Sequence, residues 1–139
     1  MDIVEFIPNV NDWVHWAQRH KTMLIGPVAI LGGMGAGKTT AVKHWLKAFN
    51  AFDEGSSPTF TLIHEYRCPE GLVYHADFYR LRSEEEGEAL GLDELFYSGR
   101  PFWMEWPEKI ANLLPPESSV VQIEAQEDGT RKITIRKSI

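Results

Sequence analysis

The chain has 139 residues, a formal net charge of −6 and one cysteine, Cys68. A chain of this length can bury a hydrophobic core, so we expect residues 1–139 to form a single domain. The lone cysteine excludes an internal disulfide, and the scattered basic residues argue against direct binding of a nucleic-acid backbone. Because no apolar run approaches the roughly 18 residues of a transmembrane helix, we expect a cytoplasmic protein that does not enter a membrane.

The first third of the chain alternates between strand and helix patterns. Asp2–Ile7 is predicted as a strand. Apolar residues at positions 10, 13, 14 and 17 follow helical spacing, so a helix is expected up to about His20. The apolar run Val28–Leu31 predicts a buried strand, and helical spacing behind Lys38 predicts a second helix that ends near Asn50.

The rest of the chain continues this alternation. Runs of β-branched and aromatic residues indicate strands, and a serine before three glutamates is typical of a helix N-cap. The expected elements are strands over Thr59–Tyr66 and Leu72–Tyr79 joined by a turn at Pro69–Gly71, helices from Ser83 and near Leu92–Tyr97, a strand at Pro101–Trp106, a helix near Pro107–Leu114, and a hairpin turning at Asp128-Gly129. The basic residues of Arg131–Lys137 are expected on a solvated strand face. Together these elements predict an α/β fold with a central mixed, partly antiparallel sheet flanked by helices.

The segment Gly32–Thr39 lies between the second strand and the second helix and matches the pattern G-x-x-x-x-G-K-[ST]. In this pattern backbone N–H groups surround a β-phosphate, and Lys38 reaches the β- and γ-phosphates. The Thr39 hydroxyl can bind Mg²⁺, and the helix N-terminus adds positive potential. A glycine-rich turn with an exposed lysine is the alternative, but the flanking strand and helix favour a nucleotide-binding loop.

Two carboxylates end predicted strands. Asp77 follows Leu72–Ala76, and Glu105 follows Phe102–Met104. Ligands of open α/β sheets bind at the carboxyl ends of strands, and a phosphate loop needs a further acidic group to hold Mg²⁺. Each carboxylate is therefore a magnesium candidate, with an ordinary solvated strand end as the alternative. His75 shares a face with Asp77, which allows either a hydrogen-bonded pair near the magnesium or an ordinary strand histidine.

Three further features concern the nucleotide. Thr59 follows Ser57-Pro58 in a region where nucleotide switches place a threonine that reaches Mg²⁺ or the γ-phosphate, although the spacing alone favours a polar loop with a threonine that begins a strand. Trp106 either walls the nucleotide or a partner surface, or packs in the core. The chain has no Asn-Lys-x-Asp segment that would read guanine, so adenine is favoured, held by apolar contacts just before the first helix.

Five segments in this order resemble one protein family over nearly the whole chain. They are Gly32–Thr40, Ser57–Leu62, His75–Leu81, Gly91–Phe96 and Glu105–Glu108. This series resembles the bacterial TsaE P-loop ATPases. The chain departs from the family at Gly33-Met34, where the relatives commonly carry an Asp-Leu pair, so any role of that acid is absent here.

The resemblance implies an Mg²⁺-dependent ATPase needed for threonylcarbamoyladenosine modification of tRNA next to the anticodon. It implies action with a TsaB–TsaD protein pair, with tRNA reached only through those partners. By this resemblance Thr39 and Glu105 bind Mg²⁺, Asp77 is the Walker-B-like acid needed for hydrolysis, and Thr59 lies in a switch-like loop. The implied ATP-binding residues are Gly32, Gly33, Met34, Gly35, Ala36, Gly37, Lys38, Thr39 and Thr40.

Two other functions remain open from the sequence. A small-molecule kinase uses the same loop but usually needs an arginine-rich lid, and the chain has no arginine-dense insertion. A non-hydrolytic docking module would use ATP only as a conformational ligand. Arg80 and Arg82 are arginine-finger candidates only by their proximity to Asp77, so we expect slow hydrolysis by the isolated chain and completion of the site by a partner.

Overall fold

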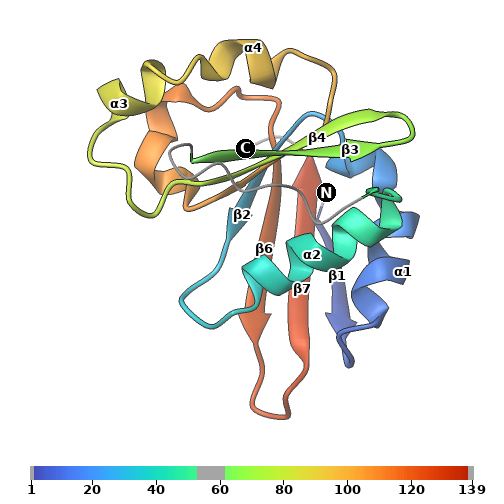
Figure 1. The fold of residues 1–139 in the computed structure, drawn as a ribbon. Coiled ribbons are helices and arrows are strands. Elements are labelled where there is room, and N and C mark those ends of the chain that lie inside the picture. Colours follow the sequence, from blue (N-terminus) through green and yellow to red (C-terminus); the bar gives the residue numbers. More distant parts are fainter. Residues whose placement is uncertain (1, 53–61, 138–139) are drawn as a thin grey trace.

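The computed structural model describes residues 2–52 and 62–137, and all of the strands in these ranges belong to one sheet. The strands are β1 (Asp2–Ile7), β2 (Pro27–Leu31), β3 (Ile63–Cys68), β4 (Gly71–Asp77), β5 (Phe102–Glu105), β6 (Ser119–Ala125) and β7 (Arg131–Lys137). Their order across the sheet is β1-β7-β6-β2-β5-β4-β3 (Figure 1). β2, β4, β5 and β6 run parallel, whereas β1, β3 and β7 pair antiparallel to their neighbours. The expected mixed α/β sheet is confirmed.

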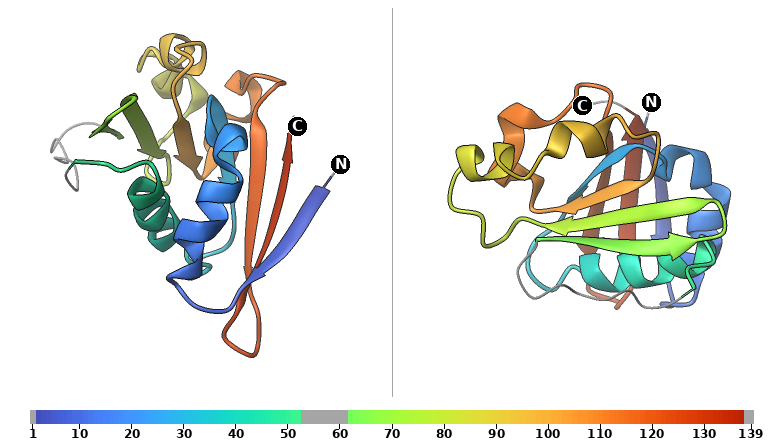
Figure 2. Two further views of the ribbon diagram at one scale, coloured as in Figure 1. Left: turned by 90° about the vertical axis from the view of Figure 1, so that its right-hand side faces the viewer. Right: turned by 45° about the horizontal axis from the view of Figure 1, so that its top comes forward.

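Helices cover the two faces of the sheet. On one face lie α1 (Asp12–Arg19) and α2 (Lys38–Ala48), seen to one side of β1, β6 and β7 in the left view of Figure 2. The short 3₁₀ helix η1 (Lys21–Leu24) follows α1. The helices α3 (Glu84–Glu88), α4 (Leu92–Phe96) and the 3₁₀ segment η2 (Pro107–Leu113) form a second group, packed beyond β4 and β5. Within the described ranges, every helix is too short or too polar to cross a bilayer.

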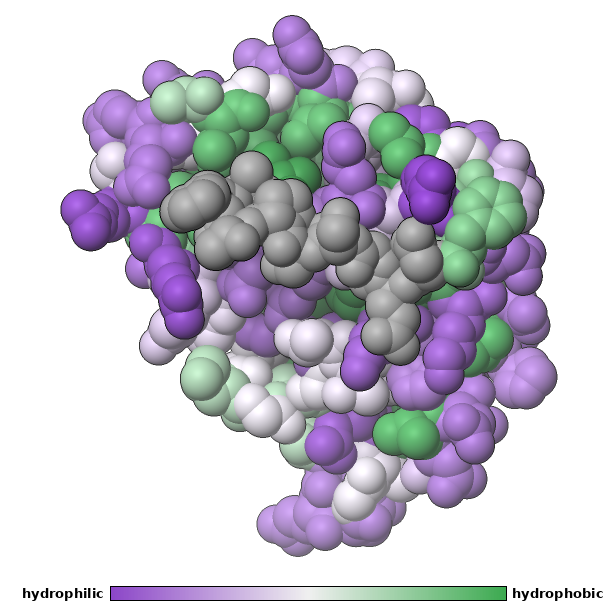
Figure 3. All heavy atoms as spheres, in the orientation of Figure 1, coloured by the Kyte–Doolittle hydropathy of each residue, from purple (hydrophilic) through white to green (hydrophobic). Residues whose placement is uncertain are grey.

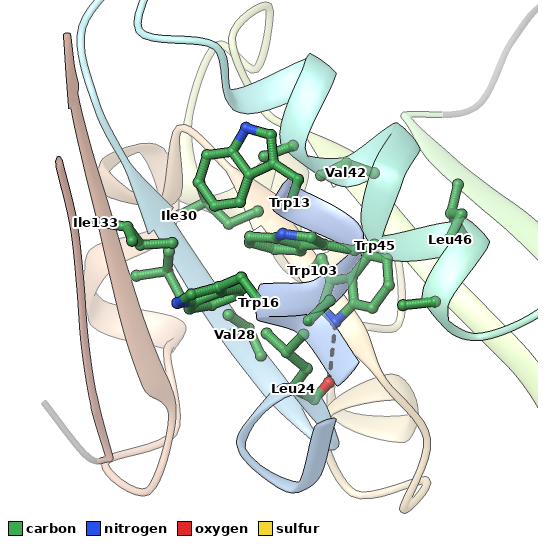
Figure 4. Packing of buried hydrophobic residues seen from close by; sticks show 14 of the residues in the cluster. Trp13, Trp16, Leu24, Val28, Ile30, Val42, Trp45, Leu46, Trp103 and Ile133 are labelled. Atoms are coloured by element: carbon green, nitrogen blue, oxygen red, sulfur yellow. Dashed lines mark hydrogen bonds between the residues drawn. The ribbon is translucent and has the colours of Figure 1, made fainter. Parts of the chain in front are cut away.

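Buried tryptophans join α1 and α2 to the sheet. Trp16 stacks on Trp45 with ring centroids 5.5 Å apart, and Trp45 meets the edge of Trp103 at 5.4 Å (Figure 4). The indole Nε1 of Trp103 donates a hydrogen bond of 2.9 Å to the carbonyl of Leu24. Since aromatic pairs in these geometries add to the stability gained from burial, they fix α2, and the loop that precedes it, against β5.

A second apolar cluster lies on the opposite face of β5. Phe102 and Met104 of β5 pack there with Phe78, Phe96 and Ile110. Because neighbouring residues of a strand point to opposite faces, β5 is buried on both sides, which explains its uninterrupted apolar pattern. In Figure 3 hydrophobic side chains gather in the upper part of the view, around α3 and α4, while most of the remaining visible surface is polar.

The boundaries of α2 follow from its end residues. Gly37 precedes the helix with a φ of 100°, a conformation that favours glycine. After the helix, Asn50 adopts a φ of 60°, and the N–H groups of Asn50 and Ala51 donate to the carbonyls of Lys47 and Leu46. This is a Schellman end, which asparagine tolerates better than most residues. The expected end of this helix near Asn50 is confirmed.

Three expected elements differ from those observed. The segment Pro107–Leu114, expected as one helix, is instead a pair of 3₁₀ turns, because the fully buried Ile110 adopts a φ of −129° that breaks it. The strand expected over Leu72–Tyr79 ends at Asp77, whose carboxylate accepts the N–H of Tyr79 in a turn. β3 runs over Ile63–Cys68, so the strand expected over Thr59–Tyr66 does not include Leu62 and ends two residues later, and residues 59–61 lie outside the described residues. Both expected hairpins are confirmed.

Candidate functional site

The carboxyl ends of β2, β4 and β5 border a cavity of about 530 Å³. Parallel strands place their carboxyl ends at one edge of the sheet, and α2 points its N-terminus toward the same edge. The lining residues are Gly33, Met34, Gly35, Ala36, Gly37, Lys38, Thr39, Thr40, Leu62, His64, Asp77, Tyr79, Arg80, Glu105 and Trp106. The predicted loop and both predicted carboxylates therefore meet at one cavity.

The loop needs glycine at some of its positions and not at others. A Cβ on Gly32 would lie 2.9 Å from the backbone oxygen of Ile123, closer than real Cβ contacts allow. Gly35 has a φ of 79°, which L side chains rarely adopt. A Cβ on Gly33 would meet nothing within 4 Å. Gly33, one of the two residues at which this chain departs from the family it resembles, therefore has room for a side chain.

The side chain of Lys38 is only 7% exposed although it carries a charge. Its Nζ donates a 2.7 Å hydrogen bond to the carbonyl of Gly32 and lies 3.7 Å from the ring centroid of Trp106. An ammonium group over an indole face is attracted by the ring quadrupole. Lys38 therefore sits at the cavity wall with its charge beside the loop, where the sequence pattern places it.

Trp106 lines the cavity with a strained backbone. Its φ is 57°, and it directly precedes Pro107, a position that normally requires extended dihedrals. The indole contacts Tyr79 with ring centroids 5.1 Å apart and lies under the ammonium of Lys38. The half-buried ring lines the cavity and also packs against the second apolar cluster, so the structure is compatible with both placements that the sequence left open.

Glu105 forms the centre of a buried polar network at the end of β5. Its side chain is 4% exposed. The Thr39 hydroxyl is 3.2 Å from its Oε1 and 3.4 Å from its Oε2, and the Nε2 of His75 is 2.7 Å from Oε2. The sequence placed His75 beside Asp77, but its hydrogen bond goes to Glu105 on the neighbouring strand. The sequence held no signal for this pairing, because it depends on the register between β4 and β5.

Asp77 lies opposite Glu105 in the register of β4 and β5. Its Oδ1 accepts the N–H of Tyr79 at 3.0 Å, and the carboxylate lines the cavity together with Arg80. Burial lowers the pKa of the nearby His64, and His75 lowers it further, while the charge of Asp77 opposes the shift. Thr59, the remaining predicted catalytic residue, lies outside the described residues.

The side chains of Thr39, Asp77 and Glu105 offer oxygen atoms at this edge, which suits a hard cation. The described residues hold no group of three or more His, Cys, Asp and Glu side chains able to bind a metal ion by themselves. Mg²⁺ usually takes one or two carboxylates and completes its shell with phosphate and water oxygens. The hydroxyl of Thr39 and the carboxylate of Glu105 fit that requirement, and the carboxylate of Asp77 lies at the same cavity.

A basic residue that the sequence placed on a solvated strand face lies against the loop. Arg131 donates from Nε to the carbonyl of Ala36 at 2.9 Å, so the expectation of a purely solvated basic tail is wrong for this residue. Long-range pairing of the terminal hairpin causes the contact, and no local pattern reveals it. Beside it lies a cavity of about 150 Å³, lined by Ile7, Pro8, Asn9, Val10, Trp13, Gly37, Thr40, Gly129 and Arg131.

Comparisons with known proteins agree on one family. A family model described as threonylcarbamoyl adenosine biosynthesis protein TsaE matches residues 7–133. The chain is similar to the tRNA threonylcarbamoyladenosine biosynthesis protein TsaE of Haemophilus influenzae, with 36% identity over 91% of this chain and 85% of the relative. The Bacillus subtilis protein of that name is 40% identical over 74% of this chain and 64% of the relative. The crystal structure of Bacillus subtilis YdiB matches with a TM-score of 0.76 and 28% identity, covering 100% of this chain and 86% of that one.

Proposed function

The chain belongs to the TsaE family of threonylcarbamoyl adenosine biosynthesis proteins, and from this we propose that it hydrolyses Mg²⁺-ATP as a step in threonylcarbamoyladenosine modification of tRNA. The observation that carries the proposal is the contact between Thr39 and Glu105 at the end of the phosphate loop. A hydroxyl and a carboxylate at this point are the groups with which P-loop ATPases hold Mg²⁺ beside the β- and γ-phosphates.

The residues Gly32–Thr40 bind the phosphates in this proposal. Two observations support a backbone shaped to surround an anion. Gly32 lies close to the backbone of Ile123, and both Gly35 and Gly37 have a positive φ. The smaller cavity continues from Gly37 and Thr40 toward the segment before α1. Its apolar wall supports a base subsite there, and adenine is the proposed base.

The catalytic groups have separate roles. Lys38 places its charge against the β- and γ-phosphates, and Thr39 and Glu105 supply oxygen ligands to the magnesium. When bound, Mg²⁺ neutralises developing charge on the phosphate oxygens. The Asp77 carboxylate faces the same cavity and orients the attacking water, and Thr59 acts from the switch-like segment. Catalysis then rests on position and charge rather than on a covalent intermediate.

Residues 1–139 act in this proposal as one P-loop ATPase domain in the cytoplasm, together with a TsaB–TsaD protein pair. The net charge of −6 supports contact with tRNA through those partners rather than directly. Arg80 lines the cavity, and within residues 2–52 and 62–137 no hydrogen bond or ion pair fixes its guanidinium group. This supports slow hydrolysis by the isolated chain and completion of the site by a partner.

The test is a reconstituted modification reaction with candidate TsaB and TsaD proteins, tRNA, ATP and Mg²⁺. We expect co-purification of this chain with the pair in the presence of ATP, and formation of the modified nucleoside only when the chain is present. Modification that proceeds equally well without the chain would contradict the proposal. Transfer of labelled γ-phosphate to a metabolite would instead indicate a kinase. Full modification by the Asp77→Asn variant without phosphate release would indicate a docking module.

A further inference from the structure

The side chain of His75 is buried beside Glu105 and remains without a role in the proposed reaction. We propose that His75 is a positioning residue: it holds the Glu105 carboxylate in the orientation that binds Mg²⁺, and it does not itself touch metal or nucleotide. The inference rests on the proposed function, since it concerns the magnesium site of that function.

The sheet places the two side chains next to each other. β4 and β5 are parallel and adjacent, and their register sets His75 opposite Trp103 and Asp77 opposite Glu105. His75 is 7% exposed and Glu105 is 3% exposed, so water contributes little to the solvation of either group. Because a buried carboxylate is costly unless it is hydrogen-bonded, the donors around Glu105 determine where its oxygens lie.

Of the two oxygens of Glu105, only Oε2 contacts His75, whereas the Thr39 hydroxyl lies near both. A carboxylate only accepts, so the 2.7 Å contact requires the proton on Nε2 of His75, which donates to Oε2. Thr39 approaches Oε1 most closely, at 3.2 Å. His75 therefore holds Oε2, and Oε1 is the oxygen nearer to the Thr39 hydroxyl, so that hydroxyl and Oε1 lie close enough to serve one cation.

The ring of His75 is itself held in place. It stacks on the ring of His64 from β3, with centroids 6.0 Å apart and an angle of 25° between the planes. The donor atom therefore has a defined direction before any metal binds. When a residue hydrogen-bonds to a metal ligand without touching the metal itself, its replacement typically lowers metal affinity by about 10- to 100-fold. We expect a loss of about that size when His75 is replaced.

The test compares three substitutions at one position. His75→Phe keeps a ring against His64 but removes the donor. His75→Gln can place an amide nitrogen near the former Nε2, whereas the shorter His75→Asn places it near the former Nδ1, away from Glu105. His15→Gln on the exposed face of α1 serves as the matched control. Thermal unfolding of each variant without nucleotide checks that it folds.

The readout is binding of a non-hydrolysable ATP analogue measured by calorimetry, once with excess EDTA and once over a series of Mg²⁺ concentrations. We expect His75→Phe to raise the Mg²⁺ concentration needed for half-maximal enhancement of binding by about 10- to 100-fold. Its affinity in EDTA should stay within about twofold of the parent, since the phosphate loop is unchanged. His75→Gln should restore most of the Mg²⁺ response, and His75→Asn should not.

A Mg²⁺ response of His75→Phe equal to that of the parent would overturn the inference while leaving the proposed function intact. If His75→Phe does not fold, the comparison of His75→Gln with His75→Asn tests the inference. Equal Mg²⁺ responses of these two variants would then overturn the inference. A parent protein that binds no ATP analogue with or without Mg²⁺ would overturn the proposed function, and this inference with it.

Discussion

The hydroxyl of Thr39 lies 3.2 Å from Oε1 of Glu105, although 66 positions separate the two residues in the chain. The first turn of α2 and the last residue of β5 meet there because Trp45 and Trp103 pack α2 against the sheet. A core contact and a site contact thus depend on the same pair of elements. A substitution that loosens the packing of Trp45 on Trp103 should therefore also disturb the contact between Thr39 and Glu105.

Replacing Glu105 tests the magnesium site. Glu105→Gln keeps the size of the side chain and one acceptor oxygen but removes the charge that attracts a divalent cation. We expect the Mg²⁺ concentration for half-maximal phosphate release to rise by about 10-fold or more. Glu108→Gln, an exposed carboxylate on η2, is the control and should respond to Mg²⁺ as the parent does. An unchanged Mg²⁺ requirement in Glu105→Gln would remove this residue from the site.

Two neighbouring glycines of the loop should respond differently to alanine. Gly32→Ala places a Cβ 2.9 Å from the Ile123 oxygen, so the loop or β6 must shift. We expect a loss of about 1–3 kcal/mol in the free energy of unfolding, together with weaker nucleotide binding. Gly33→Ala meets open space and should change neither quantity measurably. Urea unfolding and calorimetry measure both, and equal behaviour of the two variants would show that this close approach does not constrain the loop.

Removing the indole nitrogen of Trp103 tests the attachment of η1 to the sheet. Trp103→Phe leaves a smaller ring and deprives the buried Leu24 carbonyl of its 2.9 Å hydrogen bond. We expect a loss of about 1–3 kcal/mol in the free energy of unfolding. Denaturant unfolding measures it, with Tyr97→Phe at an exposed aromatic as the control. A loss no larger than that of the control would mean that the indole does not hold the helix.

Stability should fall on mild acidification. Burial lowers the pKa of His44, and the charges of Lys47 and Lys43 add to the shift. The unfolded state therefore binds a proton near the ordinary pKa of about 6.5, while the folded state binds it only at lower pH. The stability that His44 contributes is fully present above its pKa in the unfolded state, and it is lost as the pH falls through its lower pKa in the folded state. His64 acts in the same direction.

The measurement is urea unfolding at about pH 7.5 and about pH 5.5, on either side of the ordinary histidine pKa. His44→Gln should lose less stability between the two conditions than the parent. His15→Gln, at an exposed histidine of α1, should lose as much as the parent does. An equal loss in all three proteins would exclude His44 as a source of the acid sensitivity.

The features that short segments encode could be predicted from the sequence. The loop Gly32–Thr39, the Ser83 cap and the Asp128-Gly129 turn all depend on neighbouring residues, and the structure contains each of them. The strand ends at Asp77 and Glu105 were found because apolar runs lead directly to them. Their proximity then followed from the rule that parallel strands share an edge for their carboxyl ends.

Contacts that depend on strand register could not be predicted. The pairing of His75 with Glu105 depends on which residues of β4 and β5 lie side by side, and the contact of Arg131 with Ala36 needs the terminal hairpin to reach the loop. The 3₁₀ geometry of η2 results from burial of Ile110 in the second cluster, which overrides the local helix signal. These are tertiary effects, and local propensity carries no information about them.

Asp77→Asn gives the most direct test of hydrolysis at this site. The amide keeps the shape of the side chain and can still accept the N–H of Tyr79, but it loses the charge that orients a water molecule. Phosphate release from Mg²⁺-ATP and ATP affinity are measured together, in the presence of the TsaB–TsaD pair, with the exposed Asp93→Asn as the control. We predict unchanged ATP affinity and phosphate release lower by about 100-fold or more. Phosphate release at the rate of the parent would contradict the account.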